Sequence, residues 1–571
     1  RGCMDHTAVA AAARESLGHE DSPTDLGLAL DYRIQHLLID EYQDTSQSQE
    51  RLLRRLLAGW QGDPSRTLFC VGDPMQSIYA FREADVTLFL EAQTRGIAGV
   101  ETQPANLSAN FRSCDSLIRW INEAFSRLLP AQDDFERGAV RYTPCTATRS
   151  DERGAGVEIH ALIDRDARAE ALHVVELVEK ALQEIAELER DEAAGRHPRE
   201  VALLVRSRAA LPAILVALRE RGIPFRGVEL EGLAERRAVA DLLALTRALL
   251  HASDRTAWLA VLRAPWAGLA LSDLAIVADG DRRAPIVDRL AQRDVVAGMT
   301  EHGRRCVVRV LPVLQESVRD VGRAPLGSIV RAAWLALGGP ATIEDDSDLA
   351  NAESVFDALD RLAEEAGTRP EPSQLARAID QLKASPIGSP DARVVVMTIH
   401  KAKGLEFDTV ILPGLERRAG GPQRQLLYWT SLAVAPGMRE LILASTTERD
   451  ARGKAEPLER WMKGLDEQRQ ALELGRLAYV AATRARRRLH LVGSVATKLA
   501  KDQEEPVLKA PPGGTLLGFL WPVVEGVFDA ALAARLAAGG RTEAAPAPRP
   551  QLSRGQQYRL DEEFAPREAE W

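Results

Sequence analysis

The chain has 571 residues, enough to bury several hydrophobic cores, and its length indicates roughly three or four domains. Hydrophobic residues make up 45% of it and charged residues 27%, an ordinary balance for a globular protein. The formal net charge of −10 excludes a globally basic surface, although a groove lined locally with Arg and Lys can still bind nucleic acid.

The five cysteines are scattered and form no C-x-x-C pair, so neither a cysteine zinc site nor a disulfide framework is indicated. We find no signal peptide and expect no apolar run long enough to cross a bilayer. These features favour the reducing cytoplasm and no membrane partner.

Residues 1–35 are mostly helical in pattern and lead into the short apolar run 36–39, which ends in Asp40 and Glu41. Such a run predicts a strand buried on both faces of a parallel sheet, with the carboxylates at the end where α/β sheets bind ligands. Asp40 is placed to hold Mg²⁺ and Glu41 to orient a water for attack on a phosphate. An ordinary strand followed by an acidic turn is the alternative.

Ser46 and Gln49 match a capping box at the start of the next helix. A second buried strand is expected over residues 67–71. Tyr79 and Phe81 follow at a spacing of two, so in extended backbone they share one face and offer a stacking platform for unpaired bases. Two core aromatics are the alternative interpretation.

Arg112 carries a planar, permanently charged group that can offset charge on a transferred phosphoryl, or it forms an ordinary surface salt bridge. Ser113 is a candidate cap for the next helix. A long amphipathic helix is predicted over about 168–190, and a buried strand over 201–205. That strand ends at Arg206, where a phosphate contact and an ordinary solvated end remain equally open.

The stretch from about 233 to 385 is nearly all helical in pattern and contains no catalytic constellation. Trp258 and Trp266 are expected in its core. Helix breaks are expected at three prolines, Pro265, Pro312 and Pro340.

Residues 393–397 predict a β-branched strand with His400 at its end, either as a buried, satisfied histidine or as a contact to DNA phosphate. Gly404 allows a tight turn. Strands are also expected over 408–412 and 441–444.

A helix over 473–486 is predicted to lead into a strand over 489–493. The basic run 486–488 is typical of a solvated face and receives no role. The tail loses periodicity from about residue 500, and we expect disorder after about 540.

Five stretches resemble the motor motifs of the UvrD/RecB family of superfamily 1 helicases, and they occur in the family's order. Their residues are most similar to those of the RecB/AddA branch. The similarity covers about residues 1–500. The five stretches are Asp40–Ser46, Gly72–Arg82, Asn110–Ser113, Thr398–Phe407 and Tyr479–Arg486. One departure is Glu83, because the family usually has glycine after Arg82.

The resemblance implies an ATP-dependent helicase or translocase that uses ATP and Mg²⁺ and moves 3′ to 5′ on single-stranded DNA, in DNA repair or recombination. The implied partners are single-stranded DNA, single-strand/duplex junctions and a nuclease or recombination subunit. The implied nucleotide-site residues are Asp40 for the metal, Glu41, Gln76 at the γ-phosphate, Phe111 at adenine, Glu406 at the ribose, and Arg112 and Arg484 as arginine fingers. The implied DNA contacts are Tyr79, Phe81 and His400, with Arg206 as a further candidate.

The implied fold is α/β, with two RecA-like parallel-sheet lobes and a large helical insert in the second lobe. The expected segments are a truncated first lobe at 1–105, the second lobe at 106–232 and 389–500, the insert at 233–388, and a tail at 501–571.

The family's phosphate-binding loop, G-x-x-x-x-G-K-[ST], does not occur here; the single Gly-Lys pair is Gly453–Lys454, without the upstream glycine. We therefore expect the chain to be the carboxyl-terminal part of a longer motor and inactive alone. The metal-binding carboxylate pattern of the nuclease domain that often follows in the RecB/AddA branch is likewise not found in this sequence.

Two other functional classes stay open. In one, the chain has lost its motor and acts as a non-enzymatic DNA-binding or assembly subunit. In the other, the helical insert is the working surface, as a protein-interaction module. An in-frame phosphate loop encoded upstream of Arg1 favours the enzyme, and a native start near Met4 favours the other classes.

Overall fold

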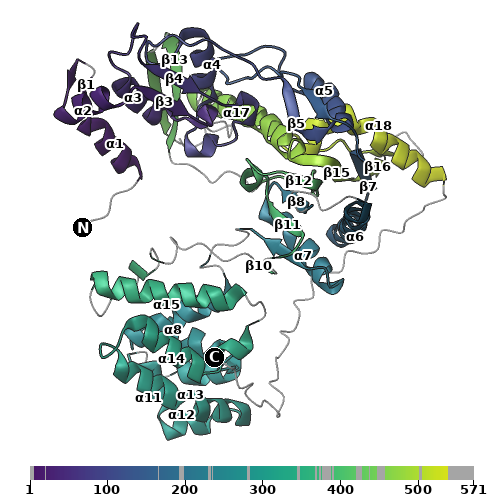
Figure 1. The fold of residues 1–571 in the computed structure, drawn as a ribbon. Helices are drawn as coiled ribbons and strands as arrows, with labels where there is room; N and C mark the ends of the chain where they lie inside the picture. The colour runs from purple at the N-terminus through teal and green to yellow at the C-terminus, as the bar shows by residue number, and fades with distance from the viewer. Residues whose placement is uncertain are drawn as a thin grey trace. The chain divides into compact units, whose positions relative to one another are not determined.

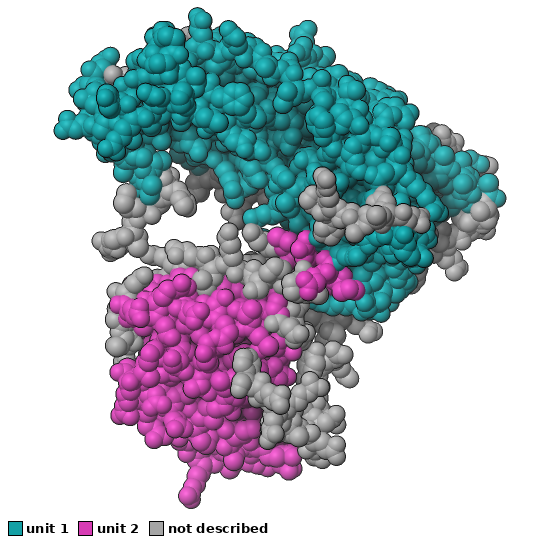
Figure 2. Space-filling view, in the orientation of Figure 1, with its two compact units in different colours: residues 1–223, 393–540 teal, residues 224–392, 541–571 magenta. Residues whose placement is uncertain are grey.

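The computed structural model describes most of the chain in two compact units (Figure 2). Unit 1 contains residues 1–223 and 393–540, and the described part of unit 2 lies within 224–392. The described residues are 6–19, 21–164, 166–191, 199–228, 233, 236–279, 283–343, 347–366, 370–371, 374–375, 378, 387–388, 391–419, 427–435, 438–445, 457–499 and 505–537. The disorder expected after residue 540 falls outside them.

Unit 1 opens with an α/β region around the parallel strand pair β3 (His36–Ile39) and β4 (Thr67–Cys70) (Figure 1). Ser46 caps α3, and its reciprocal bonds with Gln49 confirm the predicted capping box. The other elements of this region are α1 (His6–Ser16), β1 (Gly18–His19), β2 (Ser22–Pro23), α2 (Asp25–Arg33), α3 (Gln47–Leu56) and α4 (Val86–Arg95).

The prediction that the β3 strand is buried on both faces is wrong. Leu38 is 73% exposed and Phe69 60% exposed, whereas Leu37 and Leu68 pack against the cluster around Trp60. Successive strand residues point to opposite faces, and the described helices of this region cover one face of the pair. The alternation of inward and outward residues follows from that one-sided cover.

A larger parallel sheet forms the centre of unit 1, with the strand order β11-β8-β12-β15-β7. All five residues of β8 are buried, which confirms the predicted buried strand. The strands are β7 (Gly156–Ile163), β8 (Val201–Val205), β11 (Val394–Thr398), β12 (Phe407–Leu412) and β15 (Ala485–Val495). This sheet confirms the predicted α/β class with a parallel sheet.

Helices and short strand pairs surround this sheet. The predicted long helix is present as α6 (Ala167–Asp191). The other elements are β5 (Ala109–Cys114), α5 (Asp115–Leu128), β6 (Thr146–Arg149), α7 (Leu211–Glu220), β13 (Leu427–Ala435), β14 (Met438–Ser445), α17 (Pro457–Ala482), β16 (Thr497–Leu499), β17 (Pro506–Leu508) and α18 (Leu516–Ala537).

Two helix boundaries differ from the prediction. The helix expected over 473–486 begins at Pro457 and ends at Ala482, so Arg484 lies in the turn before β15. The residue at the N-cap of α5 is Cys114, without a side-chain cap. Ser113 instead donates a hydrogen bond of 2.6 Å to the carbonyl of Ala485, because β5 runs beside the start of β15.

The basic run 486–488 lies at the start of β15 and is not a solvated face, which corrects the prediction. Arg487 is 1% exposed and Arg488 8% exposed. Arg487 donates hydrogen bonds of 2.9 and 3.0 Å to Asp408 on β12, and Arg488 lies 2.7 Å from Glu184 on α6. β15 is an interior strand, so its arginines meet carboxylates from neighbouring elements rather than water.

The tail also holds more structure than its sequence pattern predicts. The helix α18 has one buried face, made by Leu516, Leu517, Leu520, Val524, Phe528 and Leu532. By length and composition, it is the single described helix that could cross a membrane, which corrects the expectation of no such run. Its buried face packs against β7 and α5, as in the core helix of a globular fold.

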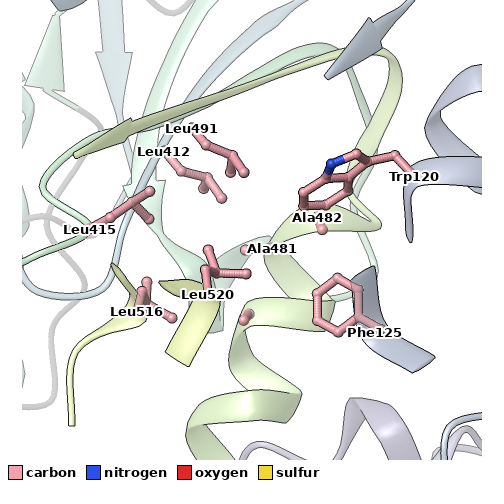
Figure 3. Close-up of a pocket in the computed structure, with 10 residues that line it drawn as sticks. Trp120, Phe125, Leu412, Leu415, Ala481, Ala482, Leu491, Leu516 and Leu520 are labelled. Carbon is pink, nitrogen blue, oxygen red and sulfur yellow. The ribbon is translucent and has the colours of Figure 1, made fainter. Parts of the chain in front are cut away.

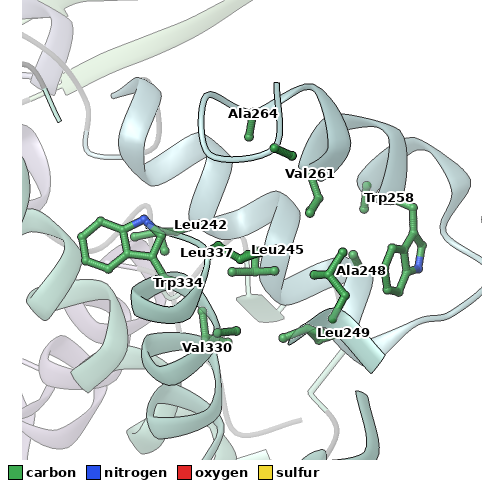
Figure 4. Close-up of a cluster of buried hydrophobic side chains, with 14 of the residues drawn as sticks. Leu242, Leu245, Ala248, Leu249, Trp258, Val261, Ala264, Val330, Trp334 and Leu337 are labelled. Carbon is green, nitrogen blue, oxygen red and sulfur yellow. The ribbon is translucent and has the colours of Figure 1, made fainter. Parts of the chain in front are cut away.

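Unit 2 is a helical bundle with its own core, in which Trp258 and Trp334 pack among aliphatic side chains (Figure 4). Trp258 and Trp266 are both buried, as predicted. The predicted break at Pro312 is wrong, because this proline lies inside α13. The elements are β9 (Phe225–Gly227), α8 (Arg237–Leu250), α9 (Arg255–Arg263), α10 (Leu271–Ala278), α11 (Ile286–Leu290), α12 (Arg293–Ala297), α13 (Glu301–Asp320), α14 (Leu326–Ala336), α15 (Ser347–Ala366) and β10 (Ile387–Gly388).

Candidate functional site

Asp40 and Glu41 lie at the carboxyl end of β3, and the turn that follows sets the direction of the Glu41 side chain. The Glu41 backbone is left-handed, with φ 53° and ψ 39°, a conformation that costs a non-glycine residue about 1–3 kcal/mol. Its N–H donates 2.9 Å to Asp40 Oδ1, and its carboxylate accepts a hydrogen bond from Gln43. The strained turn therefore holds two carboxylates side by side at the sheet edge.

Gln43 ties this turn to the loop after β4. It is fully buried, and its Oε1 accepts a hydrogen bond of 3.1 Å from the backbone N–H of Asp73. A Cβ on Gly72 would stand 2.1 Å from that same Oε1 atom. Glycine is needed at position 72 because the Gln43 side chain occupies the space.

Lys403 joins the acidic turn from the segment after β11. Its Nζ lies 3.1 Å from Glu41 Oε2 and also contacts the Asp44 carboxylate, and its side chain is 6% exposed. Burial raises the pKa of Asp44, and Lys403 opposes that rise. The sequence analysis assigned no role to Lys403; its signal was its place in the fourth of the similar stretches.

Gln76 and Arg484, both predicted site residues, are brought together. Gln76 Nε2 donates 2.8 Å to Asp73 Oδ2, and Arg484 Nη2 donates 3.2 Å to Gln76 Oε1. Arg484 is 1% exposed and also donates to the carbonyls of Val480 and Leu405. Burial, followed by the charge of Arg112, lowers the pKa of Arg484 to about 10, so its guanidinium stays charged at neutral pH.

Arg112 and Glu406 form a second predicted pair. Arg112 Nε donates 2.8 Å to Glu406 Oε2, and its Nη1 donates 3.2 Å to the carbonyl of Thr483. Burial acts to raise the pKa of Glu406, but the hydrogen bond and charge of Arg112 outweigh it and hold that pKa below its usual value. Phe111 beside them is 75% exposed, so its ring face is open to a ligand.

Tyr79, Phe81 and His400 form a three-ring cluster. The centroids of Tyr79 and Phe81 lie 5.9 Å apart, and that of His400 lies 5.4 Å from Phe81 and 6.4 Å from Tyr79. The Arg82 guanidinium lies over both Tyr79 and Phe81. With Phe81 66% exposed, the cluster offers an aromatic and cationic surface.

The backbone that carries these rings corrects the sequence prediction of an extended segment. Tyr79 precedes the 3₁₀ turn Ala80–Arg82, and Phe81 lies inside it. Glu83 ends the turn in the left-handed region, with φ 66°. This position is the one where the similar family usually has glycine, and the backbone explains that preference.

The three-ring cluster is coupled to the acidic turn. Tyr79 Oη donates a hydrogen bond of 3.1 Å to the backbone carbonyl of His400, and Lys403 Nζ lies 5.1 Å from the Tyr79 ring centroid.

Arg206, the further candidate for a phosphate contact, donates a hydrogen bond to the carbonyl of Gly514. Burial lowers the pKa of His400, and the charges of Arg206 and Arg82 lower it further. His400 is therefore neutral at pH 7.

Two residues of α17 that the sequence analysis missed hold the loop before the rings. Glu473 Oε1 accepts 3.0 Å from the N–H of Ala80, and Arg476 Nε donates 2.7 Å to the carbonyl of Ser77. Burial raises the pKa of Glu473 and lowers that of Arg476 to about 10. Both contacts join residues almost 400 positions apart, so no local pattern marks them.

A cavity beneath the large sheet is not part of this site. It is lined by apolar side chains from α5, β12, α17, β15 and α18 (Figure 3). Its volume of about 10 Å³ barely admits one water, and it offers no polar partner for one. It is a packing gap rather than a ligand site.

Two family models match the chain. The UvrD/REP helicase N-terminal domain matches residues 12–95, and the UvrD-like helicase C-terminal domain matches residues 105–294 and 343–495. The chain belongs to the UvrD-like helicase family. The two family domains meet at the site described above, because Glu41 and Gln76 lie in the first and Lys403 and Arg484 in the second.

Curated relatives of this UvrD-like chain are named as subunits of an ATP-dependent helicase/nuclease. Those from Levilactobacillus brevis and Bacillus licheniformis are 26% and 27% identical over 87% and 88% of the chain, and each is covered over 42% of its own length. A third, from Desulforudis audaxviator, is 28% identical over 83% of the chain and is covered over 40%. The chain thus spans about two fifths of these relatives.

The UvrD-like family implies a nucleotide and usually Mg²⁺, and the acidic turn fits a divalent cation. Mg²⁺ prefers carboxylate oxygens, which Asp40 and Glu41 provide at the sheet edge. Asp44 Oδ1 is buried without a hydrogen-bond partner among the described residues, so a further carboxylate oxygen beside them is unsatisfied. These oxygens suit a hard cation with its bound water.

Proposed function

We propose that the chain is part of a longer ATP-dependent DNA motor that moves 3′ to 5′ on single-stranded DNA. The observation that supports it is the meeting of two side-chain pairs from the two family domains, Lys403 with Glu41 and Arg484 with Gln76. A motor needs such contacts because nucleotide-dependent changes in one domain must alter the other.

The nucleotide side is assigned to the residues around the acidic turn. Bound ATP and Mg²⁺ supply the phosphoanhydride and the charge that activates it. In this proposal Asp40 holds the cation, Glu41 accepts a proton from the attacking water, and Gln76 orients the γ-phosphate. Arg112 and Arg484 place fixed positive charge where the transferred phosphoryl becomes more negative. Phe111 stacks on the adenine, and the Glu406 carboxylate accepts from the ribose.

The DNA side is assigned to the three-ring cluster. Stacked bases would contact Tyr79 and Phe81, while His400 and Arg206 would contact the backbone phosphates. Single strands and single-strand/duplex junctions are the proposed substrates. The helicase/nuclease name of the relatives supports a role in repair or recombination beside a second, nuclease-bearing subunit.

The decisive test is Glu41→Gln in the full-length protein. This change keeps the shape and hydrogen bonding of the side chain but removes the carboxylate that accepts the proton of the attacking water. We expect DNA-stimulated hydrolysis to fall by at least about 100-fold, the lower end for loss of a general base. Nucleotide affinity, measured with a fluorescent ATP analogue, should change less than about twofold, because a lost transition-state contact lowers rate rather than binding.

Glu83→Gln is the matched control, since Glu83 has the same left-handed backbone but lies in the turn after the rings. It should retain hydrolysis within about threefold of the parent, because no general base is removed. Near-normal hydrolysis in Glu41→Gln would refute the assignment of the acidic turn.

A further inference from the structure

Three of the chain's ten histidines, His160, His173 and His490, contact one another at one face of the large sheet. Glu158 and His160 lie two positions apart on β7, so their side chains point to the same face. The register of the parallel strands sets His490 of β15 opposite Glu158. His173 approaches from α6. None of these residues takes part in the proposed motor.

Three ligand atoms in this group face one another. His160 Nε2 lies 2.9 Å from His490 Nδ1, and Glu158 Oε2 lies 3.6 Å from His490 Nδ1 and 3.9 Å from His160 Nε2. A tetrahedral Zn²⁺ ion with bonds of about 2.0–2.1 Å separates its ligand atoms by roughly 3.3 Å. The observed triangle brackets that spacing, so shifts of about half an ångström would let all three atoms share one ion.

His173 holds one of the imidazoles in the orientation a ligand needs. Its Nε2 lies 3.2 Å from His160 Nδ1, and its own Nδ1 lies 3.7 Å from the Glu176 carboxylate. Metal-binding histidines usually donate their second ring N–H to an acceptor, which fixes the ring and its tautomer. With His173 accepting from Nδ1–H, the lone pair of His160 Nε2 points at the other two atoms.

We propose that Glu158, His160 and His490 form a binding site for one transition-metal ion of the zinc class, with His173 as the orienting residue. The ion would join the edge strand β7 to β15. The Glu158 side chain is 41% exposed and that of His490 2%, so the ion would enter past the carboxylate, where water can take the fourth position.

The charges around the group decide how tightly it binds. Arg488 Nη1 lies 3.7 Å from Glu158 Oε1, the oxygen that faces away from the histidines, and 2.7 Å from Glu184. Glu184 offsets that cation, while Lys180 adds positive charge nearby.

The test uses the whole chain, stripped with a chelator and titrated with ZnCl₂ by calorimetry and with Co²⁺ by visible absorption. We expect one equivalent of each ion, and a tetrahedral Co²⁺ spectrum. Glu158→Gln and His160→Gln should each weaken binding at least about tenfold. His173→Gln should weaken it by about 10–100-fold while leaving the stoichiometry unchanged, as expected of an orienting residue. His19→Gln, at an exposed histidine of β1, is the matched control and should bind as the parent does.

Far-UV circular dichroism checks that each variant is folded. In the parent, Zn²⁺ should raise the melting temperature, and this rise should be lost in Glu158→Gln and His160→Gln. Absence of binding in the parent would overturn the proposal and leave a hydrogen-bonded chain of neutral imidazoles. Binding that persists unchanged in both folded variants would also overturn it. Neither result depends on ATP or DNA, so the proposed motor function is tested separately.

Discussion

Lys403 contacts both the acidic turn and the three-ring cluster, so it can couple changes in one to changes in the other. Its ammonium contacts the Glu41 carboxylate and lies near the face of Tyr79, and its side chain is almost fully buried. A buried cation between two carboxylates and an aromatic face has few alternative positions. A shift of Tyr79 on binding a base would therefore change the electrostatics at Glu41.

Lys403→Met should uncouple DNA binding from hydrolysis in the full-length protein. Methionine keeps most of the side-chain volume but removes the charge that contacts both Glu41 and the Tyr79 ring. A coupling of about 1–3 kcal/mol corresponds to about 5–150-fold. We expect the ratio of ATPase rates with and without single-stranded DNA to fall at least about fivefold.

Lys463→Met is the control for this prediction, because Lys463 also pairs with a glutamate but lies on the surface of α17. Its stimulation ratio should match that of the parent. An unchanged ratio in Lys403→Met would show that the two sites communicate without this side chain.

Tyr79→Ala and Phe81→Ala should each weaken binding of single-stranded DNA by about 1–3 kcal/mol, the usual loss for one base stack. Fluorescence anisotropy with a labelled oligonucleotide measures the change, and the affinity should also fall as salt is raised. Phe135→Ala removes another exposed aromatic, distant in sequence, and should have no effect. Full affinity in both ring variants would exclude the stacking surface.

At the scale of the elements, the sequence predicts secondary structure best where burial against a single core sets the pattern of apolar residues. The five apolar residues of β8 and the length of α6 follow from local periodicity. The burial of Arg487 does not, because its partner Asp408 lies on a neighbouring strand. Likewise, the 3₁₀ turn at Phe81 depends on α17 contacts from almost 400 residues away.

The same limit applies to the site residues. The motif similarity named Gln76 and Arg484, whose contact the structure contains. It left out Glu473 and Arg476, whose contacts form when α17 packs against the loop. A charged residue on a helix looks solvated in sequence, and burial becomes visible when its partner is placed.

Asp241 on α8 offers a pH-dependent prediction for unit 2. Burial raises its pKa to about 6, although Arg237 acts against the rise. The folded state holds the proton more tightly than the unfolded state, so this group destabilises the fold above pH 6. Its penalty fades as the pH falls from about 6 to the ordinary aspartate value near 4.

Asp241→Asn should therefore raise the free energy of unfolding at pH 7.5 by about 1–3 kcal/mol, and the gain should vanish by about pH 4. Urea unfolding followed by tryptophan fluorescence at both pH values measures it. Asp357→Asn on α15 alters an exposed carboxylate and should change stability by less than about 0.5 kcal/mol. A loss of stability at pH 7.5 would mean that the charged form is the favoured one.

At the scale of the molecule, the helical unit lies in the sequence between strands of the large sheet, within the span that the family's second domain matches. The match to that domain pauses after residue 294 and resumes at 343, inside the helical unit, whereas the sheet strands lie before and after that unit. The strands β8 and β11 pair in parallel although unit 2 separates them in sequence. The large sheet is therefore formed by strands from both sides of unit 2 in the sequence. Lys403 follows β11, so its position depends on the pairing of β11 with β8.

The last prediction concerns ATP hydrolysis by the 571-residue chain alone. No phosphate-binding G-x-x-x-x-G-K-[ST] sequence occurs in it. The backbone amides and lysine of that loop normally hold the β- and γ-phosphates, and without them Glu41 and Arg484 have no fixed phosphoryl to act on. We expect DNA-stimulated turnover well below the ordinary range of about 1–100 per second. Added single-stranded DNA should still bind through the three-ring cluster.

The longer motor of which we propose this chain to be part, assayed beside the chain, should turn over within that range. Glu41→Gln in the 571-residue chain is the control for contaminating ATPases, since a residual rate that this change does not lower comes from another protein. Turnover of the isolated chain within the ordinary range, abolished by Glu41→Gln, would contradict the prediction. It would mean that the site around Glu41, Gln76 and Arg484 binds the phosphates of ATP without the loop.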